Sequence, residues 1–221
     1  MIDIFDIMGP IMVGPSSSHT AGAVRIGRMA RTLLGERPVR AALHLHGSFA
    51  ETGVGHSTDR ALIGGLLGMP PHDYDIPRSF EIAGERGLSF TFDEIDLRDA
   101  HPNSVLMEIE GEMGTTMTMQ ASSTGGGRIL VNKIDGVDLA FTGDFNTLIL
   151  HTTDIRGMVA DVGYALSQAR VNVANMSLNR NSKGGDALMV IETDEVVPDP
   201  ILQLLQDLPG VKHLTYYEKE D

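Results

Sequence analysis

The sequence predicts an α+β protein built from two domains, residues 1–142 and residues 143–221. Three observations support this prediction. The length of 221 residues suits one large domain or two ordinary ones. The C-terminal part alternates strand-like and helix-like segments in the order βαββαβ. The N-terminal part combines two helical patterns with a series of short β-rich segments, which predicts helices packed against a sheet.

The N-terminal part begins with a helix that follows the serines at positions 16–18 and runs to about Leu34, where Gly35 ends it. Its apolar residues recur at helical spacing and predict one buried stripe: Ile26, Met29, Ala30 and Leu33. A strand over Val39–Phe49 and a short helix over Ser57–Leu67 are expected next. From position 80 to 137 the pattern is mostly strand, in the segments FEIAGERG, LSFTF, VLMEIEG, TTMTMQAS and RILVNKI. A short join near 138–144 has no Pro- or Ser-rich linker.

The six elements of the C-terminal part follow from spacing and turn signals, such as the polar run at 181–186 between two apolar segments. In order, the sequence predicts a strand (Phe145–Thr152), a helix (Met158–Ala169), two paired strands (Val171–Asn181 and Ala187–Thr193), a helix (Pro198–Leu208) and a last strand (Val211–Tyr217). This order is the ferredoxin-like arrangement.

The composition excludes several kinds of site and partner. Without any cysteine, the chain has no disulfide, thiolate zinc site, cysteine nucleophile or iron–sulfur cluster held by its own thiolates. The net charge is −13 and both parts are acidic, so we expect no nucleic-acid partner. No apolar run approaches the ~20 residues that span a bilayer, and Asp3 and Asp6 stand where a signal peptide is basic. We therefore expect a cytoplasmic protein with no membrane partner.

The segment GPSSSHTAG at residues 14–22 is the first candidate for chemistry. Serine caps a helix start, and the free N–H groups and the helix dipole there attract anions. One serine is enough for a cap, whereas this segment has Ser16, Ser17 and Ser18 followed by His19 and Thr20. We therefore favour a carboxylate-binding pocket with His19 at its entrance over a simple capped loop.

The segment GVGHSTD at residues 53–59 is the second candidate, and it also precedes a helix, with Ser57 as the expected cap. His56 thus shares with His19 a position beside a positive helix end, which disfavours the charged imidazolium. A neutral imidazole can accept a proton and act as a general base. The alternative, that His56 only occupies a tight glycine turn, stays open.

Two further segments are weaker signals. His44 and His46 alternate with leucines, so they share one face of a strand, and we favour a polar or interface face over a metal site. The run SSTGGG at 122–127 either brings backbone N–H groups close to a ligand or forms a flexible hairpin loop. The sequence has no G-x-S-x-G, P-loop or H-E-x-x-H motif, so a hydrolase or NTPase has little support.

Taken together, MIDIFDIMGPIMVGPSSSHTAGA, HGSFAETGVGHSTDRALIGGLLG and SSTGGG resemble the β chain of iron–sulfur-dependent L-serine dehydratase. The resemblance covers essentially the whole chain. The tail, with DIRG at 154–157 and VNVA at 171–174, resembles an ACT domain. The N-terminal domain is then similar to the allosteric substrate-binding domain of some phosphoglycerate dehydrogenases. Ser57 stands where related chains often have glycine.

The resemblance implies conversion of L-serine to pyruvate and ammonia, with a 4Fe–4S cluster held by cysteines of a separate α chain. It implies that this chain helps to bind L-serine and supplies acid/base groups. We expect His56 to be the base for the α-proton and His19 to be a second acid/base or carboxylate-positioning group. The expected serine-binding residues are Ser16, Ser17, Ser18, Thr20 and Thr58.

The resemblance also implies assembly, either a homodimer through the ACT domains or an α₂β₂ complex. Whether the ACT domain binds an amino acid, a monovalent cation or nothing stays open. The alternative function is a non-catalytic subunit that senses amino acids and regulates a partner. A cysteine-bearing partner chain distinguishes the dehydratase from the sensor.

Overall fold

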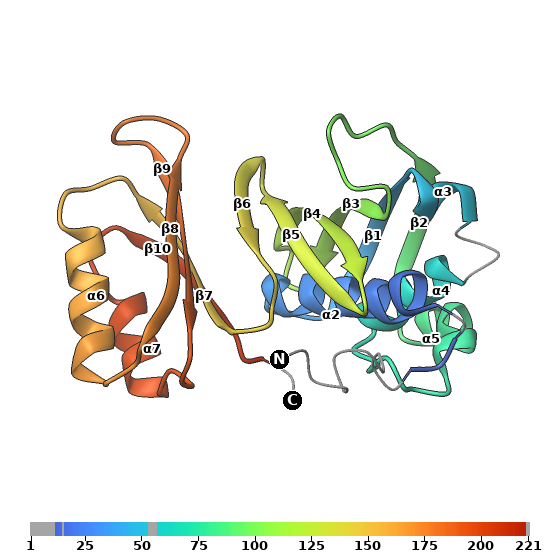
Figure 1. Cartoon of the computed structure of the whole chain (residues 1–221), viewed down its shortest axis with the longest axis horizontal. Coiled ribbons are helices and arrows are strands. Elements are labelled where there is room, and N and C mark those ends of the chain that lie inside the picture. The colour runs from blue at the N-terminus through green and yellow to red at the C-terminus, as the bar shows by residue number, and fades with distance from the viewer. Residues whose placement is uncertain (1–11, 15, 53–56, 220–221) are drawn as a thin grey trace, which may run out of the picture. The chain divides into compact units, whose positions relative to one another are not determined.

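The computed structural model describes residues 12–14, 16–52 and 57–219. The chain divides into two compact units, residues 1–136 and 137–221, and each combines a sheet with helices (Figure 1). The α+β class is therefore confirmed. The division falls at the start of strand β6 (Val137–Phe141), and the boundary expected after residue 142 lies just past the end of that strand. Within the described ranges, no helix has the length and apolar character needed to cross a membrane.

A six-stranded sheet in the order β2-β1-β3-β4-β5-β6 organises the N-terminal part of the structure. Its other strands are β1 (Pro38–His46), β2 (Ser89–Glu94), β3 (Ser104–Gly111), β4 (Thr116–Gly125) and β5 (Arg128–Ile134). Strands β1 and β2 are parallel, and the pairs β1–β3, β3–β4 and β4–β5 are antiparallel. Leu43, Met107 and Met119 are paired across β1, β3 and β4 and are all fully buried. The core therefore lies on the face of the sheet that these side chains share.

The helical elements of this unit are the π-turn η1 (Ser17–Ala21), α2 (Gly22–Leu34), α3 (Ser48–Thr52), α4 (Thr58–Leu66), the 3₁₀ turn η2 (Ile76–Arg78) and α5 (Ser79–Glu85). Helix α2 packs against α4 and contacts β3, β4 and β5 (Figure 1). Its predicted stripe is confirmed, because Ile26, Met29, Ala30 and Leu33 are all buried. Gly35 ends the helix with a φ of 76°, as predicted.

Four details of the prediction for this region are wrong. The strand predicted to Phe49 ends at His46, because Gly47 turns the chain with a φ of 54° and α3 begins at the next residue. The first six residues of FEIAGERG lie in helix α5, whose buried Ile82 and Ala83 are adjacent residues that an alternating strand would place on opposite faces. The expected join near 138–144 contains strand β6. Ser57 is not a side-chain cap for α4.

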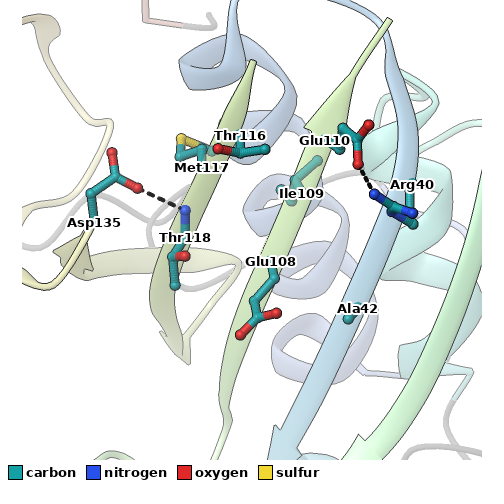
Figure 2. A pocket seen from close by; sticks show the side chains of 9 residues that line it. All are labelled: Arg40, Ala42, Glu108, Ile109, Glu110, Thr116, Met117, Thr118 and Asp135. Carbon is teal, nitrogen blue, oxygen red and sulfur yellow. Dashed lines mark hydrogen bonds and ion pairs between the residues drawn. The ribbon is translucent and has the colours of Figure 1, made fainter. Parts of the chain in front are cut away.

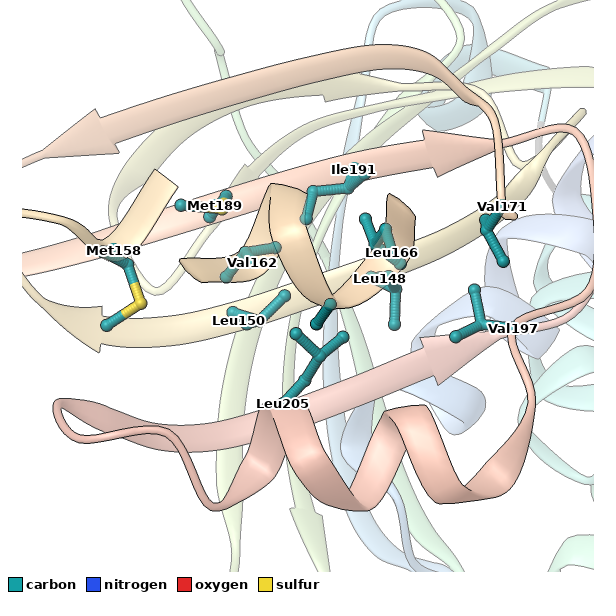
Figure 3. Close-up of a cluster of buried hydrophobic side chains, with 11 residues drawn as sticks. Leu148, Leu150, Met158, Val162, Leu166, Val171, Met189, Ile191, Val197 and Leu205 are labelled. Carbon is teal, nitrogen blue, oxygen red and sulfur yellow. The ribbon is translucent and has the colours of Figure 1, made fainter. Parts of the chain in front are cut away.

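After β6, the second unit contains β7 (Asn146–Thr153), α6 (Met158–Gln168), β8 (Val173–Arg180), β9 (Asp186–Thr193), α7 (Asp199–Gln206) and β10 (Val211–Tyr217). These six elements follow the predicted βαββαβ order. The antiparallel sheet has the order β10-β7-β9-β8, and both helices cover one face of it (Figure 1). Figure 3 shows the core between them, where Leu148, Leu150, Met189 and Ile191 from the sheet meet Leu205 and residues of α6.

Candidate functional site

The candidate site begins with η1, which carries the predicted residues Ser17, Ser18, His19 and Thr20. Ser16 precedes it in an extended conformation, and its Oγ accepts a hydrogen bond from the backbone N–H of His19 at 3.1 Å. The predicted serine cap is therefore present. The N–H of Gly22 donates a hydrogen bond to the carbonyl of Ser17, and this i to i+5 spacing defines a π-turn. The π-turn leads directly into α2. Single π-turns often occur at functional sites.

Both ring nitrogens of His19 lie within hydrogen-bond distance of serine hydroxyl groups. Nδ1 lies 3.0 Å from the Oγ of Ser18 and 3.4 Å from the Oγ of Ser16. On the other edge, Nε2 lies 3.1 Å from the Oγ of Ser48. The ring of Phe49 meets the imidazole edge-on, with ring centroids 5.4 Å apart. The structure thus brings Ser16, Ser18 and His19 together, as the sequence predicts.

Ser48 belongs to this cluster, although the sequence did not single it out. The predicted strand includes Ser48 and therefore places this residue in a sheet, whereas the structure places it at the start of a helix. Gly47 allows this change of direction, because a Cβ at this position would lie 2.7 Å from the carbonyl oxygen of Pro102. Its left-handed φ lets the chain turn there, and its carbonyl then accepts the N–H groups of Ala50 and Glu51. A glycine between strand-like and helix-forming residues was the available signal.

Small residues let other segments approach η1 closely. A Cβ at Gly14 would lie 2.6 Å from the side chain of Thr20, and one at Gly22 would lie 2.8 Å from the Cβ of Ser123. Thr20 is 1% exposed, so its side chain supports the turn from inside. Ser123 is fully buried, and its hydroxyl has no hydrogen-bond partner among the described residues.

The run SSTGGG is partly strand and partly turn. Ser122 and Ser123 lie inside β4, Gly125 ends that strand, and Gly126 and Gly127 form the hairpin turn. The three glycines have positive φ angles of 101°, 63° and 79°. The carbonyl of Gly127 accepts a hydrogen bond from Arg25 of α2 at 3.1 Å. These contacts place the buried end of β4 beside the start of α2, so this run is part of the framework of the site.

The second predicted segment is described only in part, because His56 and the three residues before it lie outside the described residues. Ser57 has a φ of 57°, the left-handed conformation that glycine adopts most easily. Thr58 begins α4, is fully buried, and its hydroxyl has no hydrogen-bond partner among the described residues. Helix α4 also contacts η1, so the second segment leads into a helix beside the first.

The face of the sheet that carries His44 and His46 holds a separate pocket of about 410 Å³ (Figure 2). Arg40 of this pocket pairs with Glu110 on the neighbouring strand, and Asp135, in the turn after β5, accepts a hydrogen bond from the N–H of Thr118 at 2.8 Å. Nearby, Nδ1 of His44 lies 2.5 Å from the Oδ1 of Asp93 on β2. These pairs link neighbouring strands, which supports the predicted polar face.

His46 is also tied to the backbone, with its Nδ1 3.2 Å from both the carbonyl of Ile95 and the N–H of Leu97. Across residues 12–14, 16–52 and 57–219, no three His, Asp or Glu side chains are grouped so that they could hold a metal ion. The cluster around His19 is therefore the stronger candidate for chemistry, and it can orient a histidine and present hydroxyl donors to a small polar ligand.

Comparison with known proteins gives consistent results. A family model described as serine dehydratase beta chain matches residues 1–133. The chain is 41% identical over 212 residues to the probable L-serine dehydratase, beta chain, of Bacillus subtilis, which covers 96% of each chain. It is 37% identical to the L-serine dehydratase, beta chain, of Peptoniphilus asaccharolyticus, over 96% of this chain and 94% of that one.

Among solved structures, the ACT domain of a GTP pyrophosphokinase from Chlorobium tepidum matches 33% of this chain and 95% of its own chain. The identity is 17% and the TM-score is 0.28.

Proposed function

Because the chain belongs to the serine dehydratase beta chain family, we propose that it is the beta subunit of an L-serine ammonia-lyase that works with an alpha chain. The complex would convert L-serine to pyruvate and ammonia. The observation that carries the proposal is the position of His19. It lies in a π-turn between the hydroxyls of Ser18 and Ser48, inside the region that the family model matches.

The proposed 4Fe–4S cluster does not fit the residues of this chain. The sequence has no cysteine, and the described residues contain no group of three metal-binding side chains. We therefore propose that the alpha chain alone ligates the cluster.

The task proposed for this chain is to bind L-serine and to move protons. The hydroxyls of Ser16, Ser17 and Ser18 surround the start of η1, where backbone N–H groups and hydroxyls suit a carboxylate. Thr58 would contribute from the start of α4, where Ser57 makes no side-chain cap bond and the buried hydroxyl of Thr58 has no partner among the described residues. Thr20, buried beneath the turn, would hold these groups in place.

Two histidines are proposed for proton transfer. His56 would remove the α-proton of L-serine, and His19 would be a second acid/base group or would position the carboxylate. A histidine that exchanges protons needs a fixed ring, and the contacts of His19 with Ser18, Ser48 and Phe49 supply one.

We further propose that the beta chains pair through their second units, as a homodimer or within an α₂β₂ complex. Strand β8 is an edge of its sheet, and Leu178 on it is 40% exposed. An edge strand with an exposed apolar side chain suits pairing with a second copy.

Anaerobic coexpression with a cysteine-bearing alpha chain tests the proposal. The purified complex should form pyruvate from L-serine and show cluster absorbance, and this chain alone should do neither. A His56→Ala complex should lose most pyruvate formation. Near-normal activity in that variant would overturn the assignment of the base.

The same experiment separates the alternative function. If His19→Asn and His56→Ala leave the maximal rate unchanged but alter its response to L-serine, the chain is a regulatory amino-acid sensor. If this chain alone forms pyruvate without metal, the division of labour between the two chains is wrong.

A further inference from the structure

We propose that Ser48 is a positioning residue for His19. The Oγ of Ser48 accepts a hydrogen bond from Nε2–H of His19 and thereby fixes the orientation and the tautomer of the ring. The observation is the 3.1 Å separation between Nε2 of His19 and Oγ of Ser48, which lie 29 positions apart in the sequence. The inference deepens the proposed function and rests on it, because it concerns a histidine that we propose exchanges protons.

Ser48 is placed rigidly enough for this task. The turn at Gly47 is packed against Pro102, and the N–H of Phe49 points to the carbonyl of the same proline at 3.5 Å. Phe49 is completely buried and anchors α3 in the core. Ser48 and Phe49 are adjacent, so one short helix presents both a hydroxyl and an aromatic ring to His19. A hydroxyl on such an anchored turn holds an imidazole better than one on a long flexible side chain.

The surroundings of Nδ1 indicate the tautomer. Two hydroxyls lie near this nitrogen, Ser18 at 3.0 Å and Ser16 at 3.4 Å. The Oγ of Ser16 already accepts the backbone N–H of His19 and also lies 3.3 Å from the Oγ of Ser18. The hydrogen of Ser16 can therefore go to Nδ1 or to Ser18, and in the second case the hydrogen of Ser18 goes to Nδ1. Nδ1 with hydroxyl donors beside it acts as the acceptor in a neutral ring, and the ring hydrogen is then on Nε2, where Ser48 accepts it.

The first test observes the ring directly in the full-length beta chain. Correlation of ring nitrogens with ring protons by ¹⁵N NMR distinguishes the two tautomers, and loss of a signal set in His19→Asn identifies His19. Wild type and Ser48→Thr should show the Nε2–H form, whereas Ser48→Ala should shift toward a mixture. Ser167→Ala removes an exposed hydroxyl from α6 and should leave the His19 signals unchanged. An Nδ1–H form in wild type, or unchanged signals in Ser48→Ala, overturns the proposal.

The second test uses the active complex with the alpha chain. Ser48→Ala should lower kcat about 10- to 100-fold, within the contribution of general acid–base catalysis, and should leave KM nearly unchanged. The pH profile of kcat should change as well, and Ser48→Thr should restore most of the rate. A Ser48→Ala complex as active as wild type overturns the proposal. An inactive wild-type complex contradicts the proposed function instead, and the NMR result then decides the hydrogen bond by itself.

Discussion

Gly27 on α2 and Gly65 on α4 meet backbone to backbone. A Cβ at Gly65 would lie 2.8 Å from the Cα of Gly27, and a Cβ at Gly27 would lie 2.9 Å from the Cα of Gly65. Both positions are fully inside the interface between the two helices. Because η1 leads into α2 and Thr58 begins α4, this close crossing sets the distance between the two segments of the candidate site.

The glycine contact predicts that Gly65→Ala destabilises the protein. The added methyl group would force the helices apart, at a cost of about 1–3 kcal/mol in the free energy of unfolding. Urea unfolding measures this change. Gly163→Ala in α6 is the matched control, because nothing lies within 4 Å of a Cβ there, and alanine should stabilise that helix. Equal effects of the two substitutions would contradict the close crossing.

The left-handed backbone of Ser57 predicts that a change to glycine stabilises the protein. A residue with a Cβ in this conformation costs about 1–2 kcal/mol, and Ser57 makes no side-chain cap bond in return. Ser57→Gly should therefore raise the unfolding free energy by about 1 kcal/mol. Ser167→Gly, at an exposed helical position in α6, should lower it. The prediction fails if both glycine variants are less stable than wild type.

Two adjacent leucines on α7 give a prediction for the second unit. Leu205 is completely buried in the core of this unit, whereas Leu204 is 49% exposed. Leu205→Ala should lose about 2–5 kcal/mol, because the removed side chain leaves a cavity. Leu204→Ala should change the stability by about 0.5 kcal/mol or less. Thermal unfolding of both variants checks the orientation of the helix, and similar losses would show that it is wrong.

The carboxylate of Asp154 predicts an acid-sensitive contact in the same unit. It accepts the N–H of Gly184 at 2.9 Å and a hydrogen bond from Arg180 at 2.6 Å, and these contacts lower the pKa of Asp154. A carboxyl with a lowered pKa in the folded state stabilises above its unfolded pKa of about 4. That stability is lost as the pH falls through the folded pKa.

Asp154→Asn should consequently be less stable than wild type at pH 7, and the difference should shrink below pH 4. Urea unfolding at a series of pH values measures both effects. Arg180→Gln, which removes one of the two partners, should reproduce part of the change. A difference between wild type and Asp154→Asn that is the same at every pH would contradict this account.

Helices, strands and buried faces could be predicted from the sequence wherever a pattern of apolar residues repeated along one element. The stripe of α2 and the six elements of the second unit were predicted because their spacing depends on local periodicity. The strand end at His46 and the helix at Ser48 were missed, because the turn at Gly47 is fixed by packing against Pro102, which is distant in sequence. The same long-range contact brings Ser48 to His19. For this reason the motif predicted the histidine but not its partner.

The contrast between His19 and His44 gives the prediction on activity. His19 lies in the η1 cluster, whereas His44 pairs with Asp93 on the polar face of the sheet. In the complex with the alpha chain, His19→Asn should lower kcat by about 10²–10⁴-fold if the ring exchanges protons. His44→Asn should stay within about twofold of wild type, because its partners connect β1 and β2 and do not belong to the cluster. Pyruvate formation at saturating L-serine measures both rates. A large loss of rate in His44→Asn with normal stability would show that His44, on the polar face of the sheet, takes part in the reaction. A fully active His19→Asn complex would show that the ring of His19 does not exchange protons and has at most a role in binding.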